Sequence, residues 1–180
     1  MGFFIAQVLA GLANASALFL VASGLSLIFG VTRIVNFAHG SLYMLGAYIA
    51  WSMMQILTGA VGFWASVAIA GIATGLIGMA IEMTILRRVY QAPELFQLVA
   101  TFGVILVIQD AALLTWGAED LLGPRAPGLA GAIAIMGQKV PKYDLALIAI
   151  MPVTGALLWY LMARTRIGIL VRAATQDREM

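Results

Sequence analysis

Several residue types and motifs are scarce or missing in this chain of 180 residues. The absence of cysteine excludes a disulfide framework, a thiolate nucleophile and the usual kind of zinc site. Charged residues make up only 10% of the sequence, whereas soluble proteins average about 25%. Together with a hydrophobic fraction of 63% and a mean hydropathy of +1.01, this scarcity of charge indicates an integral membrane protein.

Enzyme signatures are missing as well. The sequence contains no G-x-x-x-x-G-K-[S/T] phosphate-binding loop, no G-x-S-x-G and no H-E-x-x-H. The only histidine, His39, is two residues from Ser41, so on a helix the two would project from different sides and could not act as a nucleophile and its base. We therefore expect no enzymatic activity, no cofactor and no metal site. The formal net charge of +2 gives no indication of nucleic-acid binding.

Apolar segments long enough to cross a membrane dominate the chain. A hydrocarbon core of about 30 Å requires roughly 20 helical residues. The sequence predicts five spans, at about 3–22, 40–58, 61–86, 95–116 and 145–163, with the first able to extend to Gly30. The opening residues lack the basic stretch of a signal peptide, so we expect the first span to be retained. The predicted fold is an all-α, polytopic bundle of transmembrane helices.

The basic residues predict the orientation of these spans. If the residues after Ala163 are cytoplasmic, the inner side carries more basic residues than the outer side, as the positive-inside rule requires. Five crossings then place the N-terminus outside. The inner residues are Arg33, Arg87, Arg88, Arg164, Arg166, Arg172 and Arg178, and the outer ones are Arg125, Lys139 and Lys142.

Residues 117–144 connect the fourth and fifth spans and are predicted to form an external loop. The segment contains glycines, three prolines and most of the remaining charge. A weak strand signal from Ala132 to Val140 favours a short hairpin. Both an ordinary connection and a docking surface for an external partner fit this loop.

Small residues predict how the helices pack, because lipid provides no hydrophobic drive for helices to associate. In the third span, Gly71, Gly75 and Gly78 recur on one helix face, and the first two form a G-x-x-x-G pair. The second span has a weaker version at Gly46. We expect these glycines to serve helix packing in a compact bundle.

Two acidic residues fall within predicted spans, where a charge is costly. Glu82 lies about one turn from Arg87 and Arg88, so pairing or extension of the side chains to the membrane surface would satisfy it. Asp110 lies deeper, on the same side as Gly103. We expect Asp110 to have a buried, hydrogen-bonded role in preference to a role in substrate or proton transfer.

The stretch from Gly24 to Trp51 interrupts the apolar pattern with an arginine, an asparagine and the only histidine within seven residues. We interpret it as a broken membrane helix in which Asn36, Phe37 and His39 expose polar groups toward the bundle interior. Gly40 then allows the helix to restart.

The final stretch, residues 164–180, is too polar to be a span. Ile167, Leu170, Val171 and Ala174 recur at helical spacing, which predicts a short amphipathic helix on the cytoplasmic face. Two interpretations fit this pattern: a helix resting on anionic lipid headgroups, and a helix that a cytoplasmic partner grips.

Two separated stretches resemble the signature of the high-affinity branched-chain amino acid permeases of bacterial ABC importers. The segment GLSLIFGVTRIVNFAHGSLYMLGAYIAW matches that family's G-L-x-L-I-F-G, I-N-F-A-H-G and L-Y-M-L-G-A-Y pattern. The tail resembles its coupling region, T-x-x-G-x-x-x-R-A-x-x-x-D-x-x-M. The resemblance extends over essentially the whole chain. The tail positions are Thr165, Gly168, Arg172, Ala173, Asp177 and Met180.

The resemblance implies a permease subunit of a binding-protein-dependent importer in the bacterial inner membrane. Implied partners, besides the lipid bilayer, are a second permease subunit, two cytoplasmic ATPase subunits and a periplasmic substrate-binding protein. Leucine, isoleucine and valine are the implied substrates, although close relatives handle urea, amides or aromatic compounds. The residues implied for the substrate pathway are Asn36, Phe37, His39, Gly40, Ser41 and Tyr43, and those for ATPase coupling are Gly168, Arg172, Ala173 and Asp177.

Broken membrane helices also occur in ion-coupled secondary transporters and channels, so this class stays open as the alternative. The chain departs from the permease family at its end, because family members continue past Met180 through further spans. We therefore expect residues 1–180 to be a single transmembrane permease domain that is incomplete at its C-terminus. Residues 164–180 would begin the cytoplasmic coupling region.

Overall fold

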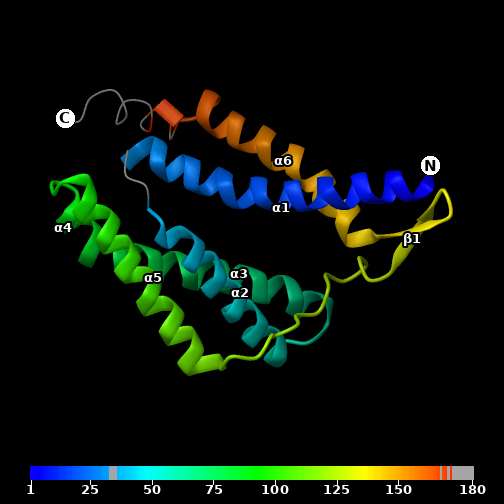
Figure 1. Ribbon diagram of the computed structural model, residues 1–180, viewed down its shortest axis with the longest axis horizontal. Coiled ribbons are helices and arrows are strands. Elements are labelled where there is room, and N and C mark those ends of the chain that lie inside the picture. Colours follow the sequence, from blue (N-terminus) through cyan, green and yellow to red (C-terminus); the bar gives the residue numbers. More distant parts are fainter. Residues whose placement is uncertain (33–35, 167, 170, 172–180) are drawn as a thin grey trace. The chain divides into compact units, whose positions relative to one another are not determined.

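The computed structural model describes residues 1–32, 36–166, 168, 169 and 171, and its elements are mostly helices (Figure 1). The chain divides into two compact units. Unit 1 comprises Met1–Arg33 and Gly128–Met180, and unit 2 comprises Ile34–Pro127. The elements are α1 (Gly2–Thr32), α2 (Ala38–Ile56), α3 (Gly59–Ile81), a π-helical turn η1 (Glu82–Leu86), α4 (Arg87–Val89), α5 (Glu94–Trp116), β1 (Ala132–Ile135), β2 (Gln138–Pro141) and α6 (Lys142–Arg164).

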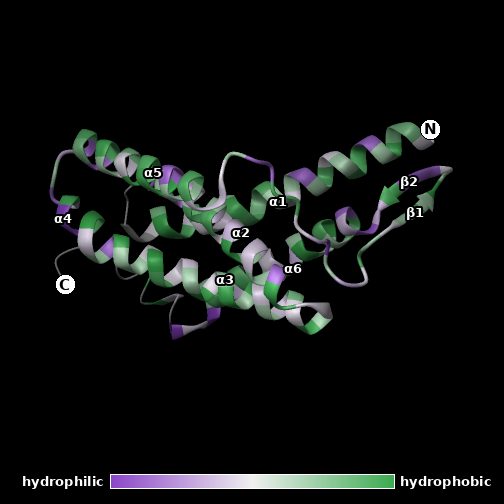
Figure 2. Cartoon of the chain, turned by 90° about the horizontal axis from the view of Figure 1, so that it is seen from below, coloured by the Kyte–Doolittle hydropathy of each residue, from purple (hydrophilic) through white to green (hydrophobic). Residues whose placement is uncertain are grey.

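Four of the described helices are long and apolar enough to cross a membrane, which confirms the prediction of an all-α, polytopic protein. The first is α1, and the second is the continuous helix formed by α3, η1 and α4. The third is α5, and the fourth is α6. In Figure 2 the helices are predominantly white to green, and α4 and the connections carry much of the purple. Four of the five predicted spans thus have the length and hydropathy of a membrane-crossing helix. The fifth, α2, is 19 residues long and carries no Asp, Glu, Lys or Arg, so its uncharged polar residues are what lower its hydropathy.

The first helix takes the longer of its two predicted extents. α1 continues through Gly24 and Gly30 to Thr32 without interruption, giving 31 residues and a length of roughly 46 Å. The chain leaves the helix after Thr32, and residues 33–35 lie outside the described residues. The next helix, α2, begins at Ala38, two residues before Gly40, where the restart was predicted.

In unit 2, α2 packs against both α3 and α5. Its buried core consists of Ala38 from α2 with Val104 and Ile108 from α5. On α3, the buried residues Gly62, Ser66 and Ala70 recur every four positions, so small side chains form the contact face. The Ser66 hydroxyl is satisfied within its own helix, because it donates to the carbonyl of Gly62 at 2.8 Å.

Of the glycines predicted to serve helix packing, Gly46 and Gly78 lie at the contact of α2 with α3, whereas the G-x-x-x-G pair contacts no other helix among the described residues. A Cβ on Gly46 would lie 3.1 Å from Oγ1 of Thr74, so this glycine allows α2 and α3 to approach closely. A Cβ on Gly71 or Gly75 would meet nothing within 4 Å. The packing face of α3 is therefore the row of Gly62, Ser66 and Ala70. Gly71 and Gly75 lie on a different side of the helix.

Aromatic residues tie the other end of α2 to α5 and to the loop that follows it. The rings of Tyr48 and Trp116 stack with centroids 5.1 Å apart. The indole N–H of Trp116 donates to the Ser52 hydroxyl at 2.7 Å, and that of Trp51 donates to the carbonyl of Leu122 at 3.3 Å. Several of the polar groups that make α2 less apolar thus have partners inside unit 2.

In unit 1, α1 packs along α6, and the predicted hairpin is present as β1 and β2 (Figure 1). The strands pair antiparallel, from Ala132 opposite Pro141 to Ile135 opposite Gln138. Met136 and Gly137 connect them with φ of 49° and 81°. Positive φ at both positions of a two-residue loop is the mark of a type I′ turn, whose twist matches the strands.

Replacing Gly62 with alanine is expected to destabilise unit 2. The chain reverses at Gly59, where φ is +83°, and a Cβ on Gly62 would lie 2.5 Å from the carbonyl oxygen of Leu57. Such overpacking costs about 1–3 kcal/mol. Gly71→Ala is the matched control, since its Cβ meets nothing within 4 Å and alanine favours a helix by about 1 kcal/mol.

The measurement is the free energy of unfolding of both variants in mixed detergent micelles. Equal stability of the two alanine variants would show that the turn at Leu57 adapts, contrary to the expectation.

Candidate functional site

The first candidate site is the start of α2, where six residues are implied for a substrate pathway. Asn36 opens the helix: its side-chain Oδ1 accepts a hydrogen bond from the backbone N–H of Ala38 at 3.0 Å. Its carbonyl accepts another from the N–H of His39 at 3.2 Å. This local arrangement is an Asx turn, so the side-chain oxygen of Asn36 helps to begin α2.

The six residues do not gather on one surface. Ser41 is 7% exposed and donates its hydroxyl to the carbonyl of Ala38 at 2.9 Å. Gly40 and Tyr43 are exposed, and His39 is half-buried. Phe37 is exposed and stacks on Phe102 of α5 with centroids 5.6 Å apart. A role in transport therefore stays a prediction for each residue separately.

The two acids within spans have surroundings that differ from those expected. Glu82 lies in η1 and accepts a hydrogen bond from the hydroxyl of Tyr90, a residue for which the sequence predicts no role. Burial and the Glu82 carboxylate raise the pKa of Tyr90 well above its ordinary value. Asp110, by contrast, was expected to be buried and is exposed on α5.

The second candidate site is the turn that follows α6. Thr165 leaves the helix with φ of −112° and ψ of 160°, which is the backbone conformation of an N-cap. Its Oγ1 accepts the backbone N–H of Gly168 at 3.4 Å, and its carbonyl accepts the N–H of Ile169 at 3.2 Å. Thr165 thus ends one helix and caps the helical turn after it.

Gly168 is buried against the last turn of α6. A Cβ at this position would overlap the carbonyl oxygen of Met162 and lie 2.6 Å from that of Leu161. The spacing T-x-x-G therefore has a physical cause, since the threonine caps the new turn and the glycine lets it fold closely onto α6. The predicted coupling residues Arg172, Ala173 and Asp177 lie outside the described residues.

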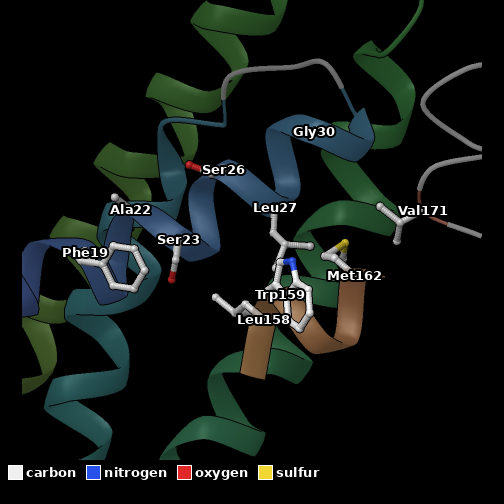
Figure 3. A pocket seen from close by; sticks show the side chains of 10 residues that line it. All are labelled: Phe19, Ala22, Ser23, Ser26, Leu27, Gly30, Leu158, Trp159, Met162 and Val171. Atoms are coloured by element: carbon white, nitrogen blue, oxygen red, sulfur yellow. The ribbon is translucent and has the colours of Figure 1, made fainter. Parts of the chain in front are cut away.

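A groove in unit 1 runs between α1 and α6 beside this turn (Figure 3). It has a volume of about 490 Å³, and most of its lining is apolar. Ser23 and Ser26 are the serines among its lining residues, and the Ser23 hydroxyl donates to the carbonyl of Leu20 at 2.8 Å. The lining residues are Phe19, Ala22, Ser23, Ser26, Leu27, Gly30, Leu158, Trp159, Met162 and Val171.

No group of three or more His, Cys, Asp or Glu residues that could hold a metal ion occurs in the part of the chain that the structure describes.

Comparison with known proteins relates these features to transport. The family described as branched-chain amino acid transport system / permease component matches residues 7–180. The chain belongs to this family. No solved structure matches the chain significantly.

Individual members of the family share low sequence identity with this chain. The chain is 26% identical over 186 residues to the high-affinity branched-chain amino acid transport system permease protein BraD of Pseudomonas aeruginosa, an alignment that covers 98% of this chain and 61% of BraD. It is 31% identical over 132 residues to the permease protein LivH of Escherichia coli K12, covering 68% of this chain and 42% of LivH. The chain thus spans about three fifths of the length of BraD.

Opening the turn after α6 is expected to expose the chain there to protease. Gly168→Ala removes the space against α6, and Thr165→Val removes the capping oxygen. Loss of an N-cap costs about 0.5–2 kcal/mol, which corresponds to a roughly two- to thirtyfold larger open population. Limited trypsin digestion in detergent measures this as faster cleavage after Arg164 and Arg166.

Gly11→Ala is the control for this experiment, because its Cβ would meet nothing within 4 Å in α1. Cleavage of the Gly168 variant at the rate of this control would mean that the turn tolerates a side chain.

Proposed function

We propose that this chain is a membrane-spanning permease subunit of a binding-protein-dependent ABC importer of the bacterial inner membrane, and that it moves branched-chain amino acids. The observation that carries the proposal is the family match over residues 7–180. Four described helices suited to crossing a membrane support it. The names of BraD and LivH supply the substrate class.

The energy for transport comes from separate ATPase subunits in this proposal. The sequence has no G-x-x-x-x-G-K-[S/T] loop to bind the phosphates of ATP. The turn after α6 is the place where the ATPases act, because there the chain leaves the last described helix through a fixed, capped geometry. Gly168 shapes this turn, and Arg172, Ala173 and Asp177 complete the contact.

On the opposite side of the membrane, a soluble binding protein delivers the substrate to the loop at 117–144. The hairpin of β1 and β2 gives this loop an ordered surface, and β2 continues directly into α6. A second permease subunit completes the pathway, to which the start of α2 contributes Asn36, Phe37, His39, Gly40, Ser41 and Tyr43.

The function is tested by uptake into proteoliposomes or cells that contain this subunit with its native partner subunits. We expect uptake of radiolabelled leucine, isoleucine or valine that needs ATP and stops when the lysine of the ATPase phosphate loop is replaced. Uptake that survives this replacement and follows an ion gradient would instead identify a secondary transporter.

His39 provides the sharpest test of the proposed pathway. We expect His39→Ala to lower uptake by about tenfold, equivalent to 1.4 kcal/mol, with the amount of assembled complex unchanged. Asn36→Ala is also expected to impair uptake, but it removes the Asx turn as well. Asn36→Asp keeps an acceptor oxygen at this turn and separates the two effects.

Uptake rate and complex yield are measured together for all three variants. Wild-type uptake by His39→Ala and Asn36→Ala would show that these side chains serve structure alone.

A further inference from the structure

The π-helical turn η1 joins α3 to α4, at the end of unit 2 where the chain turns toward α5 (Figure 1). The backbone N–H of Arg87 donates to the carbonyl of Glu82, five residues back, whereas an α-helix pairs each N–H with the carbonyl four residues back. The turn therefore holds one residue more than an α-helix would. Such turns are rare, and within α-helices they occur frequently at functional sites. A contact that holds this one in place is expected.

That contact is the hydrogen bond from the Tyr90 hydroxyl to the Glu82 carboxylate, which joins residues eight positions apart. In a regular α-helix, such positions lie about 80° apart around the helix axis. The extra residue of η1 makes them equivalent to positions seven apart, which differ by only about 20°. Tyr90 itself keeps helical backbone angles, with φ of −62° and ψ of −29°. The π-helical turn thus places both side chains on one face of the helix.

The chemistry of Tyr90 suits this contact. Its side chain points back along the helix toward Glu82, as is usual for aromatic residues on helices. Burial and the Glu82 carboxylate raise the pKa of Tyr90, so the hydroxyl stays protonated at neutral pH and remains a donor. Arg87 and Arg88, the basic residues that the sequence offers to Glu82, are exposed.

The helix is fixed on both sides of η1. On the α3 side, a Cβ on Gly78 would lie 3.5 Å from Leu42 of α2, so α3 packs closely there. On the other side, the Gln97 amide of α5 donates to the carbonyl of Tyr90 at 3.2 Å. A change in η1 therefore turns residues 87–90 relative to α3 and reaches α5 through Gln97.

We propose that the Glu82–Tyr90 hydrogen bond is a latch that holds η1 in its π-helical form, and that the turn relaxes to α-helix when the latch opens. Loss of one residue from the turn rotates residues 87–90 by about 100° relative to α3. A hydrogen bond to a charged group shifts such an equilibrium roughly tenfold to a hundredfold, so this one contact is enough to select the form. The latch itself is independent of the proposed function, whereas its opening during transport rests on that function.

The first test uses the absence of cysteine in this chain, which lets a pair of thiols be placed at will. Met83→Cys with Arg88→Cys puts thiols at exposed positions five apart across η1. In the π-helical form these positions are neighbours, like positions four apart in an α-helix, whereas in the α-helical form they lie about 140° apart. The matched control, Gln109→Cys with Leu114→Cys, has the same spacing at exposed positions of α5.

Both pairs are treated in native membranes with a short bifunctional methanethiosulfonate reagent. We expect the pair across η1 to be bridged at least fivefold faster than the pair in α5. Equal rates would overturn the inference, and this comparison needs no change to Tyr90 or Glu82.

The second test opens the latch in the background of the cysteine pair across η1. Tyr90→Phe removes the hydroxyl and is expected to slow bridging at least fivefold, whereas Tyr160→Phe, at an exposed tyrosine of α6, leaves the rate unchanged. Glu82→Gln keeps an acceptor oxygen and is expected to retain more bridging than Glu82→Leu. Size-exclusion profiles check that each variant folds. Unchanged bridging in a folded Tyr90→Phe variant would contradict the latch.

The third test asks whether the latch opens during transport. The bridge fixes η1 in its π-helical form, so we expect it to lower ATP-dependent uptake at least fivefold, and reduction with dithiothreitol to restore uptake. The control carries a monofunctional methanethiosulfonate at the same two cysteines and retains uptake. Absence of ATP-dependent uptake in the unmodified protein would reject the proposed function. Full uptake with the bridge in place would reject opening during transport alone.

Discussion

The close approach of α2 to α3 is the contact on which the rest of unit 2 depends. Helices in lipid gain nothing from burying apolar surface against one another, so they associate where their backbones can come close. Gly46 on α2 and the row Gly62, Ser66 and Ala70 on α3 provide this closeness. Since α2 also packs on α5, its position sets the places of Trp116 and of the loop that leaves α5.

This contact also explains why α2 can be less apolar than its neighbours. Ser41 and Ser52 satisfy hydroxyl groups on carbonyls of α2 itself, and Ser52 also accepts the indole N–H of Trp116. A helix with this many polar side chains is stable in a membrane when other helices share its surface with lipid. The signature from Gly24 to Trp51 begins on α1, and its second half, from Ala38 onward, lies on α2.

Much of the fold could be predicted from the sequence because membrane helices follow hydropathy closely. The helical class, the α3, α5 and α6 segments and the hairpin at Ala132 all appear in the structure. The sequence left the end of α1 open between residue 22 and Gly30, because glycines such as Gly24 and Gly30 are tolerated in membrane helices. On α3, the position of α2 decides that Thr74 and Gly78 lie at the contact, whereas Gly71 and Gly75 do not.

The candidate sites were less predictable, because they depend on contacts that form only in the folded chain. Thr165 and Gly168 were identified from a motif, but the cap and the close approach that explain their spacing appear only when the chain turns back on α6. Asp110 was expected to find a partner, and its exposure depends on neighbours that helical periodicity does not reveal. Tyr90 gave no signal, because its contact with Glu82 crosses the π-helical turn.

Unit 1 is assembled from two stretches of chain that are separated by the whole of unit 2. α1 is synthesised first, yet its packing partner α6 ends at Arg164. Domains form in the order in which their residues emerge from the ribosome. During synthesis α1 is therefore complete well before α6, the helix it packs against in unit 1, and the contacts within unit 2 can form in the interval.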